Sequence, residues 1–592
     1  MQASLDLVLH HLRAGQFADA ERVCRAGLRD APDHVGFLTF LGVTLHRLGR
    51  GGEALETCRR AVDHHPEALE ALGNLAVLLE ADGRPAQAER CLRRLQCVAP
   101  SSVLACQRLA GIRQSLGDNQ QALRHKRRVV RLTPFDQAER FNLAVVLLHT
   151  GFVDEAVQAF HSLTIIAPDD AGVVAQQGAS LLSLGRVEEA RRLFARALHL
   201  DPDNPTARNG ELRCRQFQVA MVASRHPGVP EGMLVRGPYQ GLSGYAHMTG
   251  RFVDSARAGG QPVHLIGLIG DEAWSSAPTR ILRGRSIVNC LIPPTVERAP
   301  GLMTVNLTMF EGTRIPLFWR RYSEWHDLVI VPTESSRVAW AERGFPEDRL
   351  RVCPLGVDLE TLEGPVLPLS VNGRPVSTFQ RRVLNVSDFI PRKNVDGVLR
   401  VWLTATQAND DAVLILKLGK GNPQTRAEIE ALFQQTEAVI GKRRADAAPI
   451  LVVDGTLDDG AMTGLFRNAT HYWSLSHGEG WDLPLSKAGA MGLQLVAPAH
   501  SSYVDYLDET VARMIPSTVG SAHLPNSREP WPTFFGLDWW EPNEAVAAEI
   551  IGRIVRGEDV ARLDARSRLL NRFTWAQATV RLLSILRETG AL

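Results

Sequence analysis

The sequence predicts an α-helical solenoid over residues 1–204, followed by an α/β region of two lobes with parallel sheets. Three observations predict this fold class. Proline, glycine and alanine each recur with a step of 34 residues in the first 204 residues. From Met233 onward, short apolar runs alternate with amphipathic stretches, and a stretch rich in Pro and Gly at 364–377 divides these runs into two series.

Each recurring residue type has a physical role in a stack of helix pairs. Glycine lies between two helical runs, where a sharp turn needs a left-handed backbone. Alanine lets two crossing helices approach each other, and proline ends the second helix of a pair. The three columns are Gly15, Gly49, Gly83, Gly117, Gly151 and Gly185; Ala20, Ala54, Ala88, Ala122, Ala156 and Ala190; and Pro32, Pro66, Pro100, Pro134, Pro168 and Pro202.

The columns resemble six tetratricopeptide repeats, with a capping helix and linker expected over 205–231. Such arrays present a groove that binds peptides, and position 6 of each repeat is expected to face it. Asn74 and Asn142 occupy this position, as in the asparagine ladder of O-linked N-acetylglucosamine transferase. Asparagine can hold a peptide backbone because it both donates and accepts hydrogen bonds. The alternative is that both residues are solvated helix positions.

The alternating runs predict two Rossmann-like lobes, over 232–365 and 376–555, with bracing helices over 556–592. Parallel sheets place ligands at the carboxyl ends of their strands, so two facing lobes leave a cleft for two substrates. The loops at these ends should therefore carry the chemistry.

The segment 471–507 resembles the donor-site signature of family 4 retaining glycosyltransferases, which have the GT-B fold. The resemblance implies that Glu479 is catalytic and reaches hydroxyls of the transferred sugar, and that Gly480 and Leu483 bind the donor. A loop that opens a helix suits this role, because the helix amides face the donor diphosphate. The alternative for Glu479 is a satisfied loop carboxylate.

Lys487 departs from this signature, which has a second acidic residue for the ribose hydroxyls at that position. An ammonium group only donates hydrogen bonds, whereas a carboxylate accepts them. Several interpretations stay open: Lys487 pairs with Glu479, approaches the diphosphate, belongs to an altered donor pocket, or marks weakened activity.

Segment 383–402 resembles the strand, loop and helix in which family members bind phosphates, with Arg392 and Lys393 as the basic pair. Positive charge there stabilises the departing nucleoside diphosphate. In the first lobe, Gly241 and Gly244 resemble the family's glycine-rich loop near the donor.

The stretch from Thr308 to Pro316 resembles a subgroup motif that projects Glu311 and Arg314 from a strand end into the cleft. Two roles for Glu311 are open: orienting the acceptor hydroxyl as a second catalytic residue, or pairing with Arg314.

Composition excludes several other classes of protein. The 66 basic and 65 acidic side chains leave a net charge of +1, which gives no electrostatic footprint for nucleic acid. We expect no signal peptide and no membrane span, hence a cytoplasmic protein. The eight cysteines show no metal-ligand spacing, and no acidic motif suggests a metal, so we expect metal-independent transfer without a cofactor.

A peptide-binding array joined to a transferase predicts transfer of a sugar from a nucleotide-sugar to a Ser or Thr hydroxyl of a protein docked by the repeats. The architecture resembles bacterial enzymes that glycosylate flagellin or other surface proteins. A glycan or lipid-linked acceptor is the first alternative, and a catalytically impaired scaffold is the second. Because such arrays also self-associate, a homodimer stays open.

Overall fold

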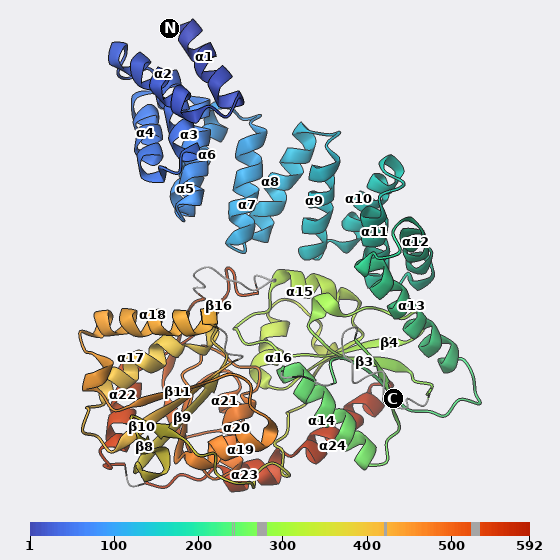
Figure 1. Cartoon of the computed structure of the whole chain (residues 1–592). Coiled ribbons are helices and arrows are strands. Elements are labelled where there is room, and N and C mark those ends of the chain that lie inside the picture. The colour runs from blue at the N-terminus through green and yellow to red at the C-terminus, as the bar shows by residue number, and fades with distance from the viewer. Residues whose placement is uncertain (240, 242, 269–280, 420–422, 523–532, 560) are drawn as a thin grey trace. The chain divides into compact units, whose positions relative to one another are not determined.

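A computed structural model describes residues 1–239, 241, 243–268, 281–419, 423–522, 533–559 and 561–592 (Figure 1). The described residues form two compact units. One holds Met1–Val173, and the other holds most of the chain that follows.

Twelve helices over residues 2–200 form consecutive antiparallel pairs. The six recurring glycines join the two helices of each pair, and all have positive φ between 72° and 84°, which explains their residue type. The six recurring alanines are fully buried. The helices are α1 (Gln2–Arg13), α2 (Phe17–Asp30), α3 (Val35–Arg47), α4 (Gly51–His64), α5 (Leu69–Ala81), α6 (Pro85–Val98), α7 (Val103–Ser115), α8 (Asn119–Leu132), α9 (Gln137–His149), α10 (Val153–Ile166), α11 (Ala171–Ser183) and α12 (Val187–Leu200).

Helix α13 (Pro205–Ser224) follows the last pair and is fixed to the first α/β lobe. Arg213 of this helix pairs with Glu297. The other carboxylate oxygen of Glu297 accepts from the buried Arg236 at 2.8 Å, so the carboxylate ties the helix to the first strand of the lobe.

The first lobe has a six-stranded parallel sheet in the order β2-β1-β3-β4-β5-β6. Its strands are almost wholly buried, as parallel strands covered on both faces should be. They are β1 (Met233–Arg236), β2 (Val263–Ile266), β3 (Ser286–Cys290), β4 (Met303–Leu307), β5 (Leu328–Val331) and β6 (Leu350–Val352), with helices α14 (Gly244–Ala258), α15 (Leu317–Tyr322) and α16 (Glu334–Ala341).

The second lobe has another six-stranded parallel sheet, in the order β11-β10-β9-β12-β13-β14. Its strands are β9 (Arg381–Ser387), β10 (Ala412–Leu418), β11 (Ile450–Asp454), β12 (His471–Trp473), β13 (Gln494–Pro498) and β14 (Arg513–Ile515). Its helices are α17 (Val395–Ala405), α18 (Pro423–Ile440), α19 (Asp459–Asn468), α20 (Leu483–Ala490), α21 (Tyr503–Tyr506) and α22 (Glu544–Val555).

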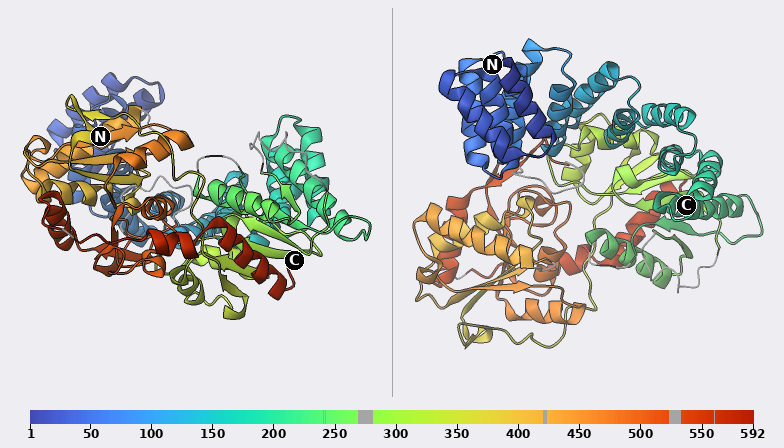
Figure 2. Two further views of the ribbon diagram at one scale, coloured as in Figure 1. Left: turned by 90° about the horizontal axis from the view of Figure 1, so that it is seen from below. Right: turned by 45° about the horizontal axis from the view of Figure 1, so that its top comes forward.

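The C-terminal helices α23 (Arg566–Arg572) and α24 (Trp575–Glu588) return the chain to the first lobe, where α24 packs beside α14 (Figures 1 and 2). Gly356 allows this return, because a Cβ there would lie 2.3 Å from the backbone nitrogen of Trp575. Two Rossmann-like lobes with a returning C-terminal helix form the GT-B arrangement, which confirms the predicted fold class.

Two short hairpins were not predicted. One, β7 (Ser370–Val371) and β8 (Arg374–Pro375), occupies the Pro- and Gly-rich stretch between the lobes. The other pairs β15 (Ser517–Ser521) with β16 (Asp538–Pro542). Within the described residues, no helix is long and apolar enough to cross a membrane.

Candidate active site

The loop after β9 holds the two predicted phosphate-binding cations. Asn394 ends this loop with a left-handed backbone (φ 53°) and caps α17 by accepting from the amide of Gly397 at 3.1 Å. Its side-chain amide donates to the carbonyl of Leu475 at 3.0 Å. These bonds fix Arg392 and Lys393 against the loop that follows β12.

Glu479, from that second loop, lies between the two cations. Its carboxylate is 2.6 Å from Lys393 Nζ and 3.0 Å from Arg392 Nη1. Glu479 is only 5% exposed, and burial by itself raises its pKa. The charges of Arg392 and Lys393 outweigh burial and hold the pKa below its ordinary value, so the carboxylate is ionised.

Glu311 of the first lobe reaches the same cluster. Its carboxylate lies 3.8 Å from Arg392 Nη2. Arg314, the partner considered for it from the sequence, bonds Asp538 of β16 at 3.2 Å. Two carboxylates from different lobes therefore share one guanidinium at the carboxyl ends of the strands, where a parallel sheet places its ligand.

Two glycines let the loops of the two lobes touch. A Cβ at Gly478 would lie 1.9 Å from the carbonyl oxygen of Glu311, so no other residue fits there. A Cβ at Gly480 would lie 2.7 Å from Cβ of Met309. Gly478 and Gly480 therefore set the spacing between the loops that carry Glu479 and Glu311.

Asp482 is the N-cap of α20 and lies within the segment that resembles the donor signature, where it was assigned no role from the sequence. It accepts from the amide of Leu485 at 3.0 Å and from the hydroxyl of Tyr503 at 2.9 Å. Burial and the nearby charge of Glu479 raise its pKa. Leu483, predicted to bind the donor, is the first residue of this helix and is partly buried.

Lys487 does not pair with Glu479. Its ammonium donates to Thr463 Oγ1 at 3.1 Å and lies 5.6 Å from the ring centre of Phe466. Burial lowers its pKa, and the charge of Asp358 opposes that effect. Asp358 also bonds Arg251 of α14 at 2.8 Å. Lys487 thus belongs to a polar contact between the lobes, and its predicted role in donor binding stays a prediction.

The first helix of the first lobe begins beside Glu311. Gly241 has φ of +127°, and Gly244 opens α14. The hydroxyl of Tyr245 bonds Thr308 Oγ1 at 2.8 Å and accepts from the amide of Met309 at 3.3 Å. The described part of the glycine-rich loop therefore leads to the start of the Glu311 loop, while donor binding by Gly241 and Gly244 stays a prediction.

The β15–β16 hairpin covers the loop before Glu479. His477 stacks on Trp539 with ring centres 4.3 Å apart, and His500 stacks on Trp540 at 5.1 Å. Trp539 and Trp540 are consecutive residues of β16, so the hairpin packs on both histidines.

In the array, Asn74 lies on α5 and is partly exposed, while Asn142 lies on α9 and is exposed. Each is on the first helix of its pair, and the side chain of neither makes a hydrogen bond within the described part of the chain. Family models of the tetratricopeptide repeat match residues 5–68, 45–109, 109–171 and 176–214. The N-terminal helices are tetratricopeptide repeats.

No curated protein sequence matches the chain. Among solved structures, HepE from Anabaena, in complex with UDP and glucose, is 13% identical and covers 60% of this chain and 100% of its own, with a TM-score of 0.45. An O-GlcNAc transferase variant from Thermobaculum terrenum is 14% identical and covers 88% and 97%, with a TM-score of 0.37. The repeat protein YrrB is 18% identical and covers 31% and 95%, with a TM-score of 0.29. At these values the matches assign no activity to the chain.

Proposed function

We propose that the protein is a glycosyltransferase that takes a sugar from a nucleotide-sugar and passes it to a Ser or Thr hydroxyl of a protein held by the repeats. The observation that carries the proposal is the buried carboxylate of Glu479 between Arg392 and Lys393, with Glu311 opposite. Two adjacent cations at a strand end suit a diphosphate, and two carboxylates suit sugar hydroxyls.

The cluster also indicates how the site would respond to a donor. The diphosphate would replace Glu479 as the partner of Arg392 and Lys393, and the released carboxylate would accept hydrogen bonds from the sugar. As the sugar–phosphate bond breaks, negative charge develops on the departing diphosphate, where the cations stabilise it. Glu311 would accept a hydrogen bond from the attacking hydroxyl and orient it.

Metal-independent transfer with retention of the anomeric configuration is part of this proposal. It follows from the resemblance to family 4 enzymes and from the two cations, which provide the charge that a metal ion supplies to a diphosphate elsewhere. An anomer-resolved NMR analysis of the product tests retention.

The protein acceptor is supported by the array. Docking an extended segment would raise the local concentration of its hydroxyls at the transferase. Asn74 and Asn142 are the residues proposed to hold its backbone, and flagellin or another surface protein is the first acceptor to test.

The test combines donor, acceptor and variants of the full chain, with transfer followed as a mass increase of the acceptor. The double change Asn74→Ala and Asn142→Ala should raise KM for the protein acceptor and leave donor affinity unchanged. Equal KM values for the variant and the wild type would show that these positions of the array do not bind the acceptor. Transfer only to a glycan or lipid-linked acceptor would support the first alternative, and donor binding without any transfer would support the scaffold.

A further inference from the structure

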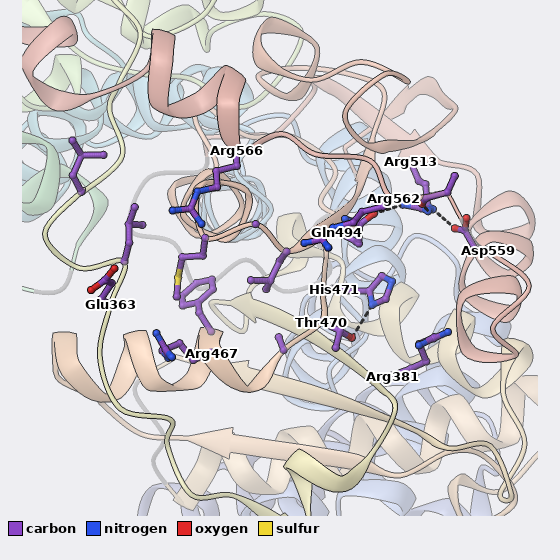
Figure 3. Close-up of a pocket in the computed structure, with 18 residues that line it drawn as sticks. Glu363, Arg381, Arg467, Thr470, His471, Gln494, Arg513, Asp559, Arg562 and Arg566 are labelled. Carbon is purple, nitrogen blue, oxygen red and sulfur yellow. Dashed lines mark hydrogen bonds and ion pairs between the residues drawn. The ribbon is translucent and has the colours of Figure 1, made fainter.

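A cavity of about 820 Å³ lies at the amino ends of four strands of the second lobe's sheet, whereas Glu479 follows a carboxyl end. Figure 3 shows its lining. Arg381, His471, Gln494 and Arg513 are the first residues of β9, β12, β13 and β14, and all four line it. Glu479, by contrast, follows the carboxyl end of β12. The cavity is therefore separate from the candidate active site.

The lining carries an excess of positive charge. Its charged residues are two acids and five arginines, and Figure 3 shows them around the cavity: Glu363, Asp559, Arg381, Arg467, Arg513, Arg562 and Arg566. His471 adds no charge at neutral pH, because burial and the neighbouring Arg513 and Arg381 lower its pKa to about 4.

The arginines divide into two groups by their contacts. Arg513 pairs with Asp559, and Arg381 donates to the carbonyl of Ile554 at 3.0 Å. The side chains of Arg467, Arg562 and Arg566 have no hydrogen bond or ion pair within the described part of the chain. These three guanidinium groups are exposed to solvent, and none of them has a partner among the described residues.

The remaining wall of the cavity is apolar. Leu359, Leu362, Phe466, Met491 and Leu493 form it. A pocket of several hundred Å³ with an apolar wall has the size of a small-molecule site. Guanidinium groups bind carboxylate and phosphate oxygens in the same paired geometry. A phosphoryl group is favoured here because it carries about two negative charges and three acceptor oxygens, and the lining has five arginines against two acids.

We infer that this cavity binds a small organic phosphate, whose phosphoryl group is bound by the unpaired arginines of the lining and whose remainder lies against the apolar wall. The inference does not depend on the proposed transfer. A sugar phosphate and a nucleotide share this chemistry, and the test below separates them.

The test is calorimetric titration of the full chain with inorganic phosphate, glucose 6-phosphate and AMP. We expect saturable binding of at least one organic phosphate. The double change Arg467→Ala and Arg566→Ala should weaken it by about tenfold or more, because each charge-assisted bond is worth that much. Binding of both organic probes would indicate that the phosphoryl group alone is recognised, and binding of AMP alone would show that the apolar wall holds a base.

Two controls distinguish binding in the cavity from binding at the active site and from general charge effects. Arg443→Ala, which removes an arginine paired with Asp446 outside the cavity, should leave binding unchanged. Arg392→Ala should also leave binding in the cavity unchanged, since Arg392 follows the carboxyl end of β9, away from the cavity. If the double variant does not fold, Arg562→Ala serves in its place. Absence of saturable binding, binding that survives the arginine changes, or loss of binding in Arg392→Ala would each overturn the inference.

Discussion

Replacement of Glu479 by glutamine tests the logic of the ion cluster. The change keeps the size of the side chain and removes its charge, so Arg392 and Lys393 lose the carboxylate that lies 3.0 and 2.6 Å away. Breaking a buried ion pair by removing one partner destabilises a protein by ~3 to 5 kcal/mol. Because glutamine retains one acceptor oxygen, we expect a loss near the lower end, about 3 kcal/mol.

The same variant should bind a free nucleoside diphosphate more tightly. In the wild-type protein the diphosphate must displace Glu479 from both cations, and in the variant it meets no competing carboxylate. We expect at least about tenfold higher affinity, which corresponds to ~1.4 kcal/mol, together with loss of sugar transfer.

Urea unfolding measures the stability, and calorimetric titration with UDP, GDP and ADP measures the affinity. The matched control is Glu430→Gln, which removes a surface partner of Arg444 and should change stability by less than ~1 kcal/mol. A Glu479→Gln variant that binds every diphosphate as weakly as the wild type, or more weakly, would refute the assignment of the two cations to the diphosphate.

Three further predictions follow from the same contacts. Gly478→Ala would place Cβ 1.9 Å from the carbonyl oxygen of Glu311, so the two loops must move apart and the rate of transfer should fall about 100-fold. The control Gly460→Ala, whose Cβ would have no contact closer than 3.4 Å, should retain activity. Equal rates for the two variants would show that the loop spacing is unimportant. The folded-state pKa of Glu479 is lowered from 4.5, so its stabilisation is complete above about pH 4.5 and is lost as the pH falls towards 2. Urea unfolding should therefore show the stability difference between wild type and Glu479→Gln shrinking between about pH 4.5 and pH 2, and a constant difference would contradict the ionised cluster. Lys487→Glu would place a carboxylate near Asp358, the acid whose charge now attracts the lysine, so donor affinity should fall in calorimetric titrations. A gain in donor affinity and in transfer would show that the natural site is impaired.

The repeat array could be predicted closely from the sequence, because its determinants are local. A left-handed glycine and a buried alanine recur at fixed positions, and each repeat contacts mainly its neighbours. The buried strands of both lobes were also predicted, since continuous apolar runs mark parallel strands. The exceptions were β14 and the hairpins. Strands β7 and β8 have only two residues each, and β15 is polar and largely exposed.

The candidate site was predicted in part. The sequence motifs identified Glu479, Arg392 and Lys393, because each motif lies on a single loop. These residues come together because the two loops follow neighbouring strands of the sheet. The contacts of Lys487 could not be predicted, because Thr463 and Asp358 come from distant segments that only the folded lobes bring near it.

The central claim is that the cluster around Glu479 is a donor site, and thermal stabilisation of the full chain by nucleotide-sugars tests it most directly. A ligand that binds only the folded state raises the melting temperature as its occupancy rises. We predict that one nucleotide-sugar stabilises the wild-type protein and that Arg392→Ala abolishes this shift. If no nucleotide-sugar raises the melting temperature, or if Arg392→Ala shows the same shift as the wild type, the cluster is not a donor site.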